Sequence, residues 1–351
     1  MTIDKGLGYL IIIICVCWAY TQGGIFGSLG VGAVGFVVYD FITQKKVWLP
    51  IGELALLLGG LQWVISPFFS YMTDNNVSHN NQKKIAAIND YSGFGRCSIA
   101  VELPVISAMK IQCCPMPTSI FSNHTGFDSF YFKDFTENMP PYMAEWKKLN
   151  LKFDGIVTGF LGSHNQIAIV EEFFKNFKTE DNIVVIDPVM GDYGNLYPTY
   201  TDETCQEMKK LVKYADILTP NLTEACIITD EPYRPDYSND ELKKIAMKLV
   251  AMGPSKIVIT GIQRGHYIGN YCYEKNREDY LIKTMKVGTQ RSGTGDIFAS
   301  IIAADAVNGV NFHESVRKAS TFIKKCILKA IEMDIPLTDG VPFEELLTTL
   351  K

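Results

Sequence analysis

The sequence lacks the local signatures of several common ligand sites. It contains no GxxxxGK[ST] segment, which excludes a P-loop, and Ser92-Gly93-Phe94-Gly95 lacks the GxGxxG spacing of a dinucleotide fingerprint. The nine cysteines form no CxxC pair and no cluster with zinc-ligand spacing, which indicates a reduced, cytosolic setting for the soluble part of the chain. A net charge of −5 and the lack of a basic patch argue against nucleic acid as a partner.

Charged residues are also scarce in the first 80 positions of this 351-residue chain. There are none from Gly6 to Tyr39, and three apolar segments can be drawn at 7–20, 25–42 and 47–71. No small-residue cleavage site ends a single apolar run, so a secretory signal peptide fits poorly. Membrane association through these segments is the favoured interpretation, although the first two are short against the roughly 20 residues that a spanning helix needs.

Two origins of this hydrophobic region stay open. It is either a fused membrane-like segment or the product of a misplaced start, because Met72 followed by a polar run would begin a complete soluble domain. We therefore expect a hydrophobic, helical segment at 1–72, a polar linker at 73–82 and one folded domain at 83–351.

From residue 83 onward, short apolar runs alternate with helical periods. This alternation predicts βαβ units and an α/β fold with a mostly parallel sheet covered by helices on both faces, and 266–285 alternates like antiparallel strands at a sheet edge. The expected strands are 83–88, 111–116, 155–159, 183–187, 216–220 and 256–260, and the expected helical segments are 96–109, 136–149, 164–177, 202–214, 240–252 and 297–307.

Polar side chains fall where the predicted strands end. These residues are Asn89, Thr158, Asp187, Thr219 and Thr260. Ligands of open α/β sheets bind beyond the carboxyl ends of the strands, so we expect the site at this edge.

One turn stands out directly ahead of the last apolar run. Ser292-Gly293-Thr294-Gly295-Asp296 has the pattern of a tight turn that opens a helix, whose first N–H groups can bind an anion such as phosphate. Gly293 and Gly295 let the anion approach the backbone, and Asp296 could take a proton from an attacking hydroxyl. The alternative is that Asp296 only caps the helix.

Three further strand exits carry candidate residues. Asp187 and Asp192 place two carboxylates on one loop, which suits a hard cation held partly through water. Asn221 and Glu224 suit a ligand site but equally resemble a capping box at a helix start. Thr260-Gly261 is compatible with holding a nucleotide phosphate without being specific for it.

Taken together, these motifs resemble a known superfamily. Asp187-Pro-Val-Met-Gly-Asp192, Thr219-Pro-Asn-Leu-Thr-Glu224 and Gly293-Thr-Gly-Asp296, in this order and spacing, are similar to the ribokinase-like superfamily, whose fold is a three-layer α/β/α sandwich. The segments 118–126 and 158–163 narrow the resemblance to the vitamin B6 (pyridoxal and pyridoxamine) kinases. The resemblance covers residues 83–350 and leaves 1–80 unrecognised.

The resemblance implies an activity, cofactors and partners. It implies phosphorylation of the 5′-hydroxymethyl group of pyridoxal, pyridoxine or pyridoxamine by ATP with Mg²⁺, a monovalent cation such as K⁺, and a homodimer. It also implies residue roles. The expected catalytic residues are Asp296 as base and Gly293, Thr294 and Gly295 as the anion hole. The residues expected to contact ATP and Mg²⁺ are Asn221, Glu224, Thr260, Gly261 and Gly295, and those expected around the metal are Asp187, Asp192 and Glu224. The expected substrate contacts are Asn89, Phe121, Thr125, Phe160 and Asp296, with His124 beside them.

Two departures from the family pattern affect the substrate assignment. Many relatives have Ser-His where this chain has Asn89-Asp90, and many have Tyr where it has Phe160, which can stack on a pyridine ring but cannot donate a phenolic hydrogen bond. The alternatives are a hydroxymethylpyrimidine kinase of the same superfamily, a membrane-anchored B6-binding protein without turnover, and a membrane protein in which the kinase is a passenger. For the remaining histidines, His79, His164, His266 and His313, the sequence indicates no partner, and they are expected to be surface or structural residues.

Overall fold

The central sheet is mostly parallel, as the alternation of the sequence predicts. A computed structural model of the chain describes residues 81–197 and 200–351. Within them one nine-stranded sheet has the order β11-β10-β9-β8-β5-β4-β1-β2-β3. The strands from β9 to β2 in this order pair in parallel, and β10, β11 and β3 pair antiparallel at the two edges. The predicted fold class and the antiparallel edge at 266–285 are confirmed.

The strands and helices have the following bounds. The sheet contains β1 (Lys84–Ser92), β2 (Gln112–Phe121), β3 (Phe132–Asp134), β4 (Gly155–Thr158), β5 (Ile183–Ile186), β8 (Ile217–Leu218), β9 (Lys256–Arg264), β10 (Tyr267–Glu274) and β11 (Tyr280–Met285), and a small hairpin contains β6 (Gly191–Asp192) and β7 (Asn195–Leu196). The helices are α3 (Ile99–Ala108), α4 (Met139–Lys148), α5 (His164–Phe177), α6 (Asp202–Leu211), α7 (Leu222–Thr229), α8 (Asn239–Ala251), α9 (Thr294–Val307) and α10 (Phe312–Glu332), with 3-10 turns at Thr136–Asn138, Val212–Tyr214, Leu337–Asp339 and Phe343–Leu350.

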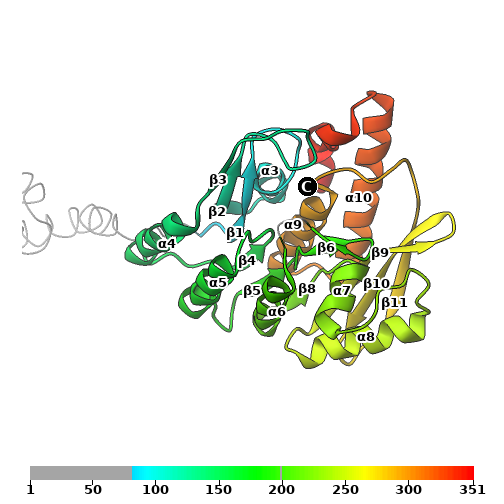
Figure 1. Ribbon diagram of the computed structural model, residues 1–351, viewed down its shortest axis with the longest axis horizontal. Coiled ribbons are helices and arrows are strands. Elements are labelled where there is room, and N and C mark those ends of the chain that lie inside the picture. The colour runs from blue at the N-terminus through cyan, green and yellow to red at the C-terminus, as the bar shows by residue number, and fades with distance from the viewer. Residues whose placement is uncertain (1–80, 198–199) are drawn as a thin grey trace, which may run out of the picture. The chain divides into compact units, whose positions relative to one another are not determined.

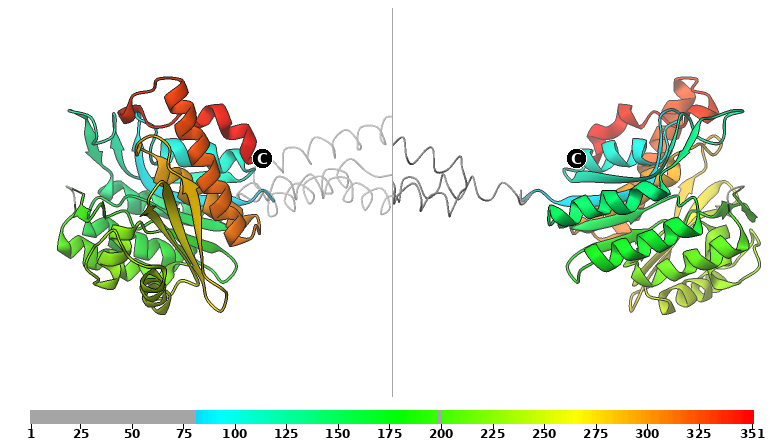
Figure 2. Two further views of the ribbon diagram at one scale, coloured as in Figure 1. Left: turned by 90° about the vertical axis from the view of Figure 1, so that its right-hand side faces the viewer. Right: turned by 60° about the vertical axis from the view of Figure 1, so that its left-hand side comes forward.

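Helices cover both faces of the sheet and form three layers (Figures 1 and 2). Along β1, Ile85 and Ala87 pack into the core beneath α3, α9 and α10, whereas Ala86 and Ile88 pack into the core beneath α4 to α8. Successive side chains of a strand point to opposite faces, so a strand covered on both sides is apolar throughout. This double burial explains why the predicted strands are continuous apolar runs.

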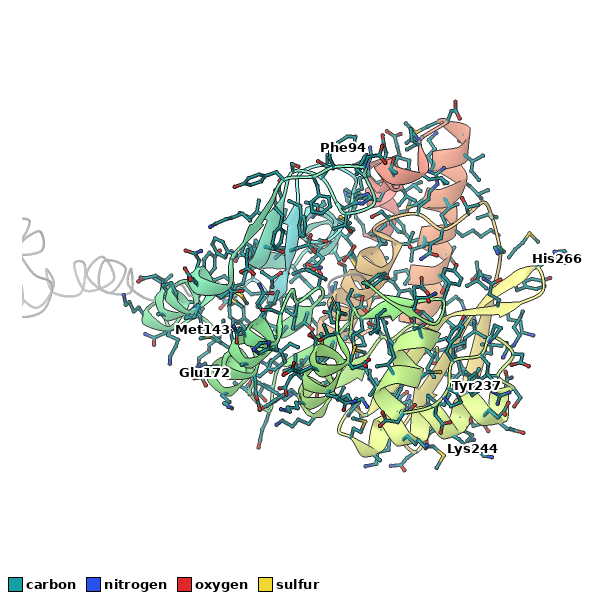
Figure 3. All side chains as sticks on the ribbon, in the orientation of Figure 1. Phe94, Met143, Glu172, Tyr237, Lys244 and His266 are labelled. Carbon is teal, nitrogen blue, oxygen red and sulfur yellow. The ribbon has the colours of Figure 1, made fainter. Side chains whose placement is uncertain are left out.

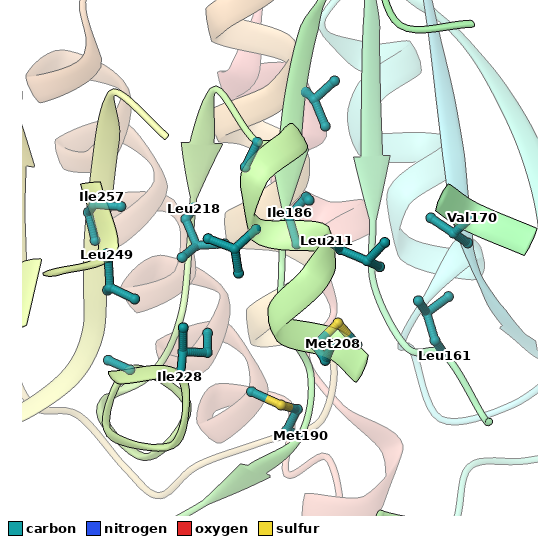
Figure 4. Packing of buried hydrophobic residues seen from close by; sticks show 14 of the residues in the cluster. Leu161, Val170, Ile186, Met190, Met208, Leu211, Leu218, Ile228, Leu249 and Ile257 are labelled. Carbon is teal, nitrogen blue, oxygen red and sulfur yellow. The ribbon is translucent and has the colours of Figure 1, made fainter. Parts of the chain in front are cut away.

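The larger core lies between the sheet and helices α5, α6 and α8. Figure 4 shows Met208 and Leu211 of α6 beside Ile186 of β5 and Leu218 of β8, all of them nearly or fully buried. The polar edge of the sheet is fixed by this packing, because the strands cannot slide without exposing the apolar rows on both faces.

The sequence prediction was wrong at the end of the first strand. The polar residues from Asn89 to Ser92 were predicted as a loop, but β1 continues through them and pairs with the extension of β2 at Tyr91↔Ile120 and Ser92↔Phe121. A register irregularity separates Asn89 from Tyr91. Asn89, Asp90 and Ser92 are buried like the residues before them, but they are polar because their side chains form hydrogen bonds there.

The longest described helix, α10, was not predicted. It alternates polar and apolar residues and buries one side against α9, while its other side carries several lysines. The predictions for residues 1–80 lie outside the described residues. Among the helices of residues 81–197 and 200–351, none combines the length and the apolar character needed to cross a membrane.

Candidate active site

The parallel register aligns the predicted polar strand ends at one edge of the sheet. Thr158 pairs with Ile186, Ile186 pairs with Leu218, and an isolated bridge joins Asn221 to Thr260. The residues that directly follow these strands, from Asp187 onward on one strand and Thr219 on the next, therefore lie together. The sequence prediction of a common polar edge is supported by this register.

The helix α9 begins with the predicted turn. Gly293 is its N-cap residue with a left-handed φ of 78°, and as a glycine it has no side chain that could cap the first N–H groups. A Cβ at position 293 would lie 2.0 Å from the carbonyl oxygen of Arg96, so only glycine fits there. Gly295 is exposed, and its Cβ position lies 3.8 Å from Oδ2 of Asp187. The helix N-terminus is thus open to a ligand and faces a carboxylate.

Asp296 lies in the first turn of α9, and its side chain reaches the end of β1. Its Oδ1 accepts a hydrogen bond from Nδ2 of Asn89 at 3.2 Å, and the backbone N–H of Ser98 donates to its carboxylate. Gly293 rather than Asp296 is the N-cap residue, and the Asp296 carboxylate accepts from its own backbone N–H as well as from Ser98 and Asn89, so capping describes only part of its contacts. Burial raises the pKa of Asp296, and hydrogen bonds from Ser98 and Asn89 oppose the rise.

Acidic side chains cluster around Asp296. Burial, with the charge of Asp296, raises the pKa of Asp187 to about 8. Burial likewise raises the pKa of Glu102 and of Glu224 well above the usual range, Asp296 adding to the first and Asp187 to the second. Like charges in a low-dielectric site disfavour ionisation. This edge of the sheet therefore concentrates negative potential that a bound cation would relieve.

The donor set fits a Mg²⁺ that keeps most of its ligands outside the protein. In the part of the chain that the structure describes, no three His, Cys, Asp or Glu side chains are grouped so as to hold a metal. Mg²⁺ in phosphate sites is commonly bound through one or two carboxylates, substrate phosphates and water. Asp187, which faces the open turn of α9, suits this arrangement best.

Asn221 and Glu224 form the capping box that the sequence left as an alternative. Oδ1 of Asn221 accepts from the N–H of Glu224 at 3.0 Å, and the N–H of Asn221 donates to Oε2 of Glu224 at 2.8 Å. The other oxygen of Glu224 accepts from the N–H of Met190 at 3.1 Å, and Nδ2 of Asn221 donates to the carbonyl of Gly191 at 2.7 Å. These contacts fasten the loop after β5, and with it Asp187, to the start of α7.

Asp192 is held by a residue that the sequence did not suggest. Its Oδ2 accepts from Nε2 of Gln290 at 2.8 Å, so the loop after β5 is tied to the segment that leads into α9. At the next strand exit, Thr260 is half-buried and Gly261 is exposed, with no atom within 4 Å of its Cβ position. Both residues are accessible, but their surroundings do not identify a ligand.

The predicted ring-binding residues differ in their surroundings. Phe121 is 6% exposed and packs against Phe132 with ring centroids 4.8 Å apart. Phe160 is half-buried, 6.1 Å from the ring of Tyr200. Thr125 lies exposed in a turn. Their substrate contacts stay a prediction, with Phe160 the better placed of the two aromatic rings.

His124 joins three loops near this end of the sheet. Its Nε2 lies 2.7 Å from the carbonyl oxygen of Thr338, and its Nδ1 accepts from the N–H of Gly126, so a neutral ring that donates from Nε2 satisfies both. The ring also packs 4.8 Å from Phe127. Phe94, which packs on Phe127, is exposed at the rim of this region (Figure 3).

Other histidines match the expectation only in part. His164 and His266 are exposed. His313 has partners that the sequence did not indicate, since it hydrogen-bonds Arg317 at 3.2 Å and its ring centroid lies 4.0 Å from that of Tyr280, as suits a structural residue. His79 lies outside the described residues.

Arg291 was also missed by the sequence reasoning. It is 8% exposed and its Nη1 donates to the carbonyls of Ile335, Pro336 and Gly340 at 2.8, 2.9 and 3.2 Å. Its own carbonyl accepts from Oγ1 of Thr294 at 3.1 Å. The turn before α9 is therefore anchored to the C-terminal loop, and the sequence offers no signal for this because all three acceptors are backbone atoms.

Asp90 belongs to the same group of buried acids, and its raised pKa should be visible in the pH dependence of the free energy of unfolding. Burial raises its pKa to about 6; the hydrogen bond from Ser98 opposes the rise and the charge of Asp296 adds to it. Since this pKa is raised on folding, the folded protein keeps a proton that the unfolded chain loses from about pH 4 to about pH 6. The free energy of unfolding should fall as pH rises through that window, by up to about 3 kcal/mol from this group.

Asp90→Asn should remove this part of the pH dependence. Asn can accept from Ser98 and donate to Ser92, so it keeps both contacts without the buried charge. We expect the stability of the variant relative to the unmodified protein to rise by about 2 kcal/mol between pH 4.5 and pH 7.5, measured by urea unfolding. The exposed Asp181→Asn is the control and should run parallel to the unmodified protein. If the unfolding free energy of Asp90→Asn instead follows the same pH dependence as that of the unmodified protein, the raised pKa of Asp90 is contradicted.

Comparison with known proteins agrees with this geometry. The pattern of the phosphomethylpyrimidine kinase family matches residues 103–337. A crystal structure from Bacteroides thetaiotaomicron, assigned as a phosphomethylpyrimidine kinase, is 39% identical with a TM-score of 0.76 and covers 77% of this chain and 94% of its own. A second crystal form of that protein, with pyridoxal, is 38% identical with a TM-score of 0.75 and covers 77% and 96%.

Two curated relatives carry different substrate names. A pyridoxal kinase from Arabidopsis thaliana is 31% identical over 198 residues, which cover 54% of this chain but only 62% of the plant protein, less than two thirds of its length. A hydroxymethylpyrimidine/phosphomethylpyrimidine kinase from Aquifex aeolicus is 25% identical over 248 residues, which cover 69% and 88%. The resemblance derived from the motifs is confirmed, and the chain belongs to the family of the phosphomethylpyrimidine and pyridoxal kinases.

Proposed function

We propose that this protein transfers the γ-phosphoryl group of ATP to the 5′-hydroxymethyl group of pyridoxal, pyridoxine or pyridoxamine. The observation that carries the proposal is the N-terminus of α9, where the glycine N-cap leaves the first turn open beside the carboxylates of Asp296 and Asp187. An anion-binding turn with a proton acceptor in the same turn is what transfer to an alcohol requires. The similar Bacteroides protein with pyridoxal supports the choice of a B6 compound.

The chain's own residues would act in the transfer as follows. The N–H groups of residues 293–296 hold the transferred phosphoryl group while its bond to the β-phosphate oxygen breaks and a bond to the hydroxymethyl oxygen forms. Asp296 accepts the hydroxyl proton. Asp187 would bind the Mg²⁺ that accompanies the phosphates, and Glu224 and Asp192 fix the loop that carries Asp187. Mg²⁺, when bound, neutralises charge that develops on the phosphate oxygens.

The remaining roles are proposals that follow from the motifs. Thr260 and Gly261 contact the nucleotide, which suits their accessibility. Asn221 acts on the nucleotide mainly through the loop that it holds, because its amide is already bonded on both sides. A K⁺ ion and a homodimer stay predictions from the family resemblance. We place the kinase domain in the cytoplasm because its substrate is ATP, and a tether through 7–71 stays a prediction.

A hydroxymethylpyrimidine is the second candidate acceptor. The family pattern and the Aquifex relative favour it, and both rings carry a hydroxymethyl group that the same turn can serve. The test is turnover with pyridoxal, pyridoxine, pyridoxamine and hydroxymethylpyrimidine side by side. We expect kcat/KM for at least one B6 compound to exceed that for the pyrimidine about tenfold or more, as a pocket fitted to one ring allows. The reverse order would replace the B6 assignment.

The same assay separates a kinase from a B6-binding protein without turnover, which would bind pyridoxal and consume no ATP. The activity of a chain that begins at Met72 tests a different point, which is whether residues 1–71 are needed for the chemistry. We expect the chain begun at Met72 to turn over B6 substrates, because residues Asn80–Lys351 form a compact unit in which the described strands and helices enclose two hydrophobic cores.

A further inference from the structure

Asn89 is enclosed in a way that leaves no polar group for a ligand. Its side chain donates to Oδ1 of Asp296 and to Oε1 of Glu102, both at 3.2 Å. Its Oδ1 accepts from the N–H of Asp90 at 2.9 Å and from the N–H of Phe160 at 2.8 Å. An amide has two donor hydrogens and two acceptor lone pairs, so all four are used. A flipped amide would turn its NH₂ group toward the N–H groups of Asp90 and Phe160, and this excludes the other orientation.

The position of the Asn89 amide is also fixed by packing. The residue is 1% exposed, and a Cβ at Gly159 would lie 2.3 Å from its Nδ2. The amide therefore occupies space that only glycine at 159 leaves free, and the Thr158-Gly159 strand end exists in this chain partly to receive it. A side chain held by four hydrogen bonds and by close packing has one rotamer.

Glu102 accepts from the same amide nitrogen of Asn89 as Asp296 does. It lies on α3 at 1% exposure, in a stretch that is otherwise apolar around it. One of its oxygens accepts from Asn89, and the other is buried without a hydrogen-bond partner. A buried polar atom without a partner costs stability, so an apolar residue would serve the helix better. Burial and the charge of Asp296 raise its pKa, which favours a neutral acid at this position.

We propose that Asn89 and Glu102 are positioning residues for the base: Glu102 holds the Asn89 amide, and the amide holds the Asp296 carboxylate toward the open turn of α9. The inference rests on the proposed kinase function, and it changes the predicted role of Asn89 from a substrate contact to an orienting group. Asp296 would otherwise rotate about its side-chain bonds, and a misplacement of about 1 Å can reduce turnover about 100-fold.

A pair of substitutions at Glu102 separates positioning from fold support. Glu102→Leu removes the unpartnered oxygen but also leaves one buried donor of Asn89 without an acceptor. These two effects oppose each other, so its unfolding midpoint should stay close to that of the unmodified protein. Its kcat should nevertheless fall about 10- to 100-fold, with KM for ATP changed less than about threefold. Glu102→Gln keeps a neutral acceptor oxygen for Asn89 and should restore kcat to within about fivefold of the unmodified value.

The experiment uses the full chain, with pyridoxal, the other B6 compounds and hydroxymethylpyrimidine as acceptors. Glu145→Ala, which removes an exposed ion pair with Lys148 on α4, is the control and should leave all constants unchanged. If the unmodified protein turns over none of these acceptors, the proposed function fails. If it turns over one of them and Glu102→Leu stays within threefold in kcat, the positioning role fails while the function stands.

Two further outcomes also decide the proposal. An equal loss in Glu102→Gln and Glu102→Leu would overturn it, because the acceptor geometry would then be irrelevant. Should Glu102→Leu not fold, Asn89→Asp gives the answer, since it keeps the shape but removes both donors to Asp296 and Glu102. It should lose at least tenfold in kcat with KM for ATP retained, and unchanged turnover would overturn the proposal.

Discussion

Replacement of Asp296 by Asn should abolish most turnover while leaving the fold intact. Asn matches the size of Asp and can still accept a hydrogen bond from Asn89 or Ser98, but it cannot take the hydroxyl proton. Loss of a general base reduces turnover by about 10²- to 10⁴-fold. We therefore expect kcat with a B6 substrate to fall within this range and binding of pyridoxal to change by less than about threefold, measured by steady-state assay and by equilibrium titration.

The stability of Asp296→Asn should rise or stay unchanged, although its turnover falls. The carboxylate is partly enclosed, and burial raises its pKa, so a neutral side chain relieves a cost to the fold. An unfolding midpoint at or above that of the unmodified protein would show that turnover was lost without loss of structure. The exposed Asp181→Asn, at the opposite end of β5, should change neither quantity. Near-normal turnover in Asp296→Asn would remove Asp296 from the mechanism.

Gly293→Ala should damage both stability and activity. Alanine is strained at a φ of 78° by roughly 1 kcal/mol, and its Cβ would lie 2.0 Å from the carbonyl oxygen of Arg96, which is backbone and cannot turn away. The turn and the loop after β1 must move apart. We expect a loss of about 2–4 kcal/mol in the free energy of unfolding, together with at least a 100-fold loss of kcat, because the N–H groups of the turn are displaced.

Gly309→Ala is a matched control at the other end of the same helix. Gly309 has a φ of 77°, almost the value at Gly293, but nothing lies within 4 Å of its Cβ position. It should lose only the roughly 1 kcal/mol of left-handed strain and keep its kcat. Urea unfolding of both variants therefore isolates the contribution of the contact with Arg96. Equal losses in the two variants would mean that strain alone, and not the closeness of the Arg96 carbonyl, sets the requirement for glycine.

The buried acidic residues at this edge of the sheet lower the stability of the folded protein. Asp90, Asp187 and Asp296 each have a raised pKa because burial disfavours their charged forms. Binding of Mg²⁺ and nucleotide to the folded protein should relieve this and raise its unfolding midpoint. This is the usual relation between an enzyme's site and its stability, in which groups arranged for chemistry are not those that would best stabilise the chain.

Local patterns in the sequence were enough for the fold class and for the turn at α9. Apolar runs such as 183–187 predict strands because a strand that is buried on both faces must be apolar along its length. The Gly-Thr-Gly-Asp turn can be recognised because its residues are consecutive. The capping box of Asn221 and Glu224 is likewise local, with a spacing of three residues. Residues 1–80, in contrast, carry a composition but no described structure, so their predicted membrane association stays a prediction.

The tertiary structure alone decided what holds the site together. Asn89 and Asp296 are 207 positions apart in the chain, and Arg291 binds carbonyls up to 49 positions away, so no local pattern can pair them. Glu102 could have been noticed as an acid in an apolar stretch, but its partner could not. The sequence by itself determined which residues can do chemistry here and at which sheet edge they lie. Only the fold decided which of them lie at the open turn of α9 and which hold another residue, because that depends on contacts between strands and helices distant in the chain.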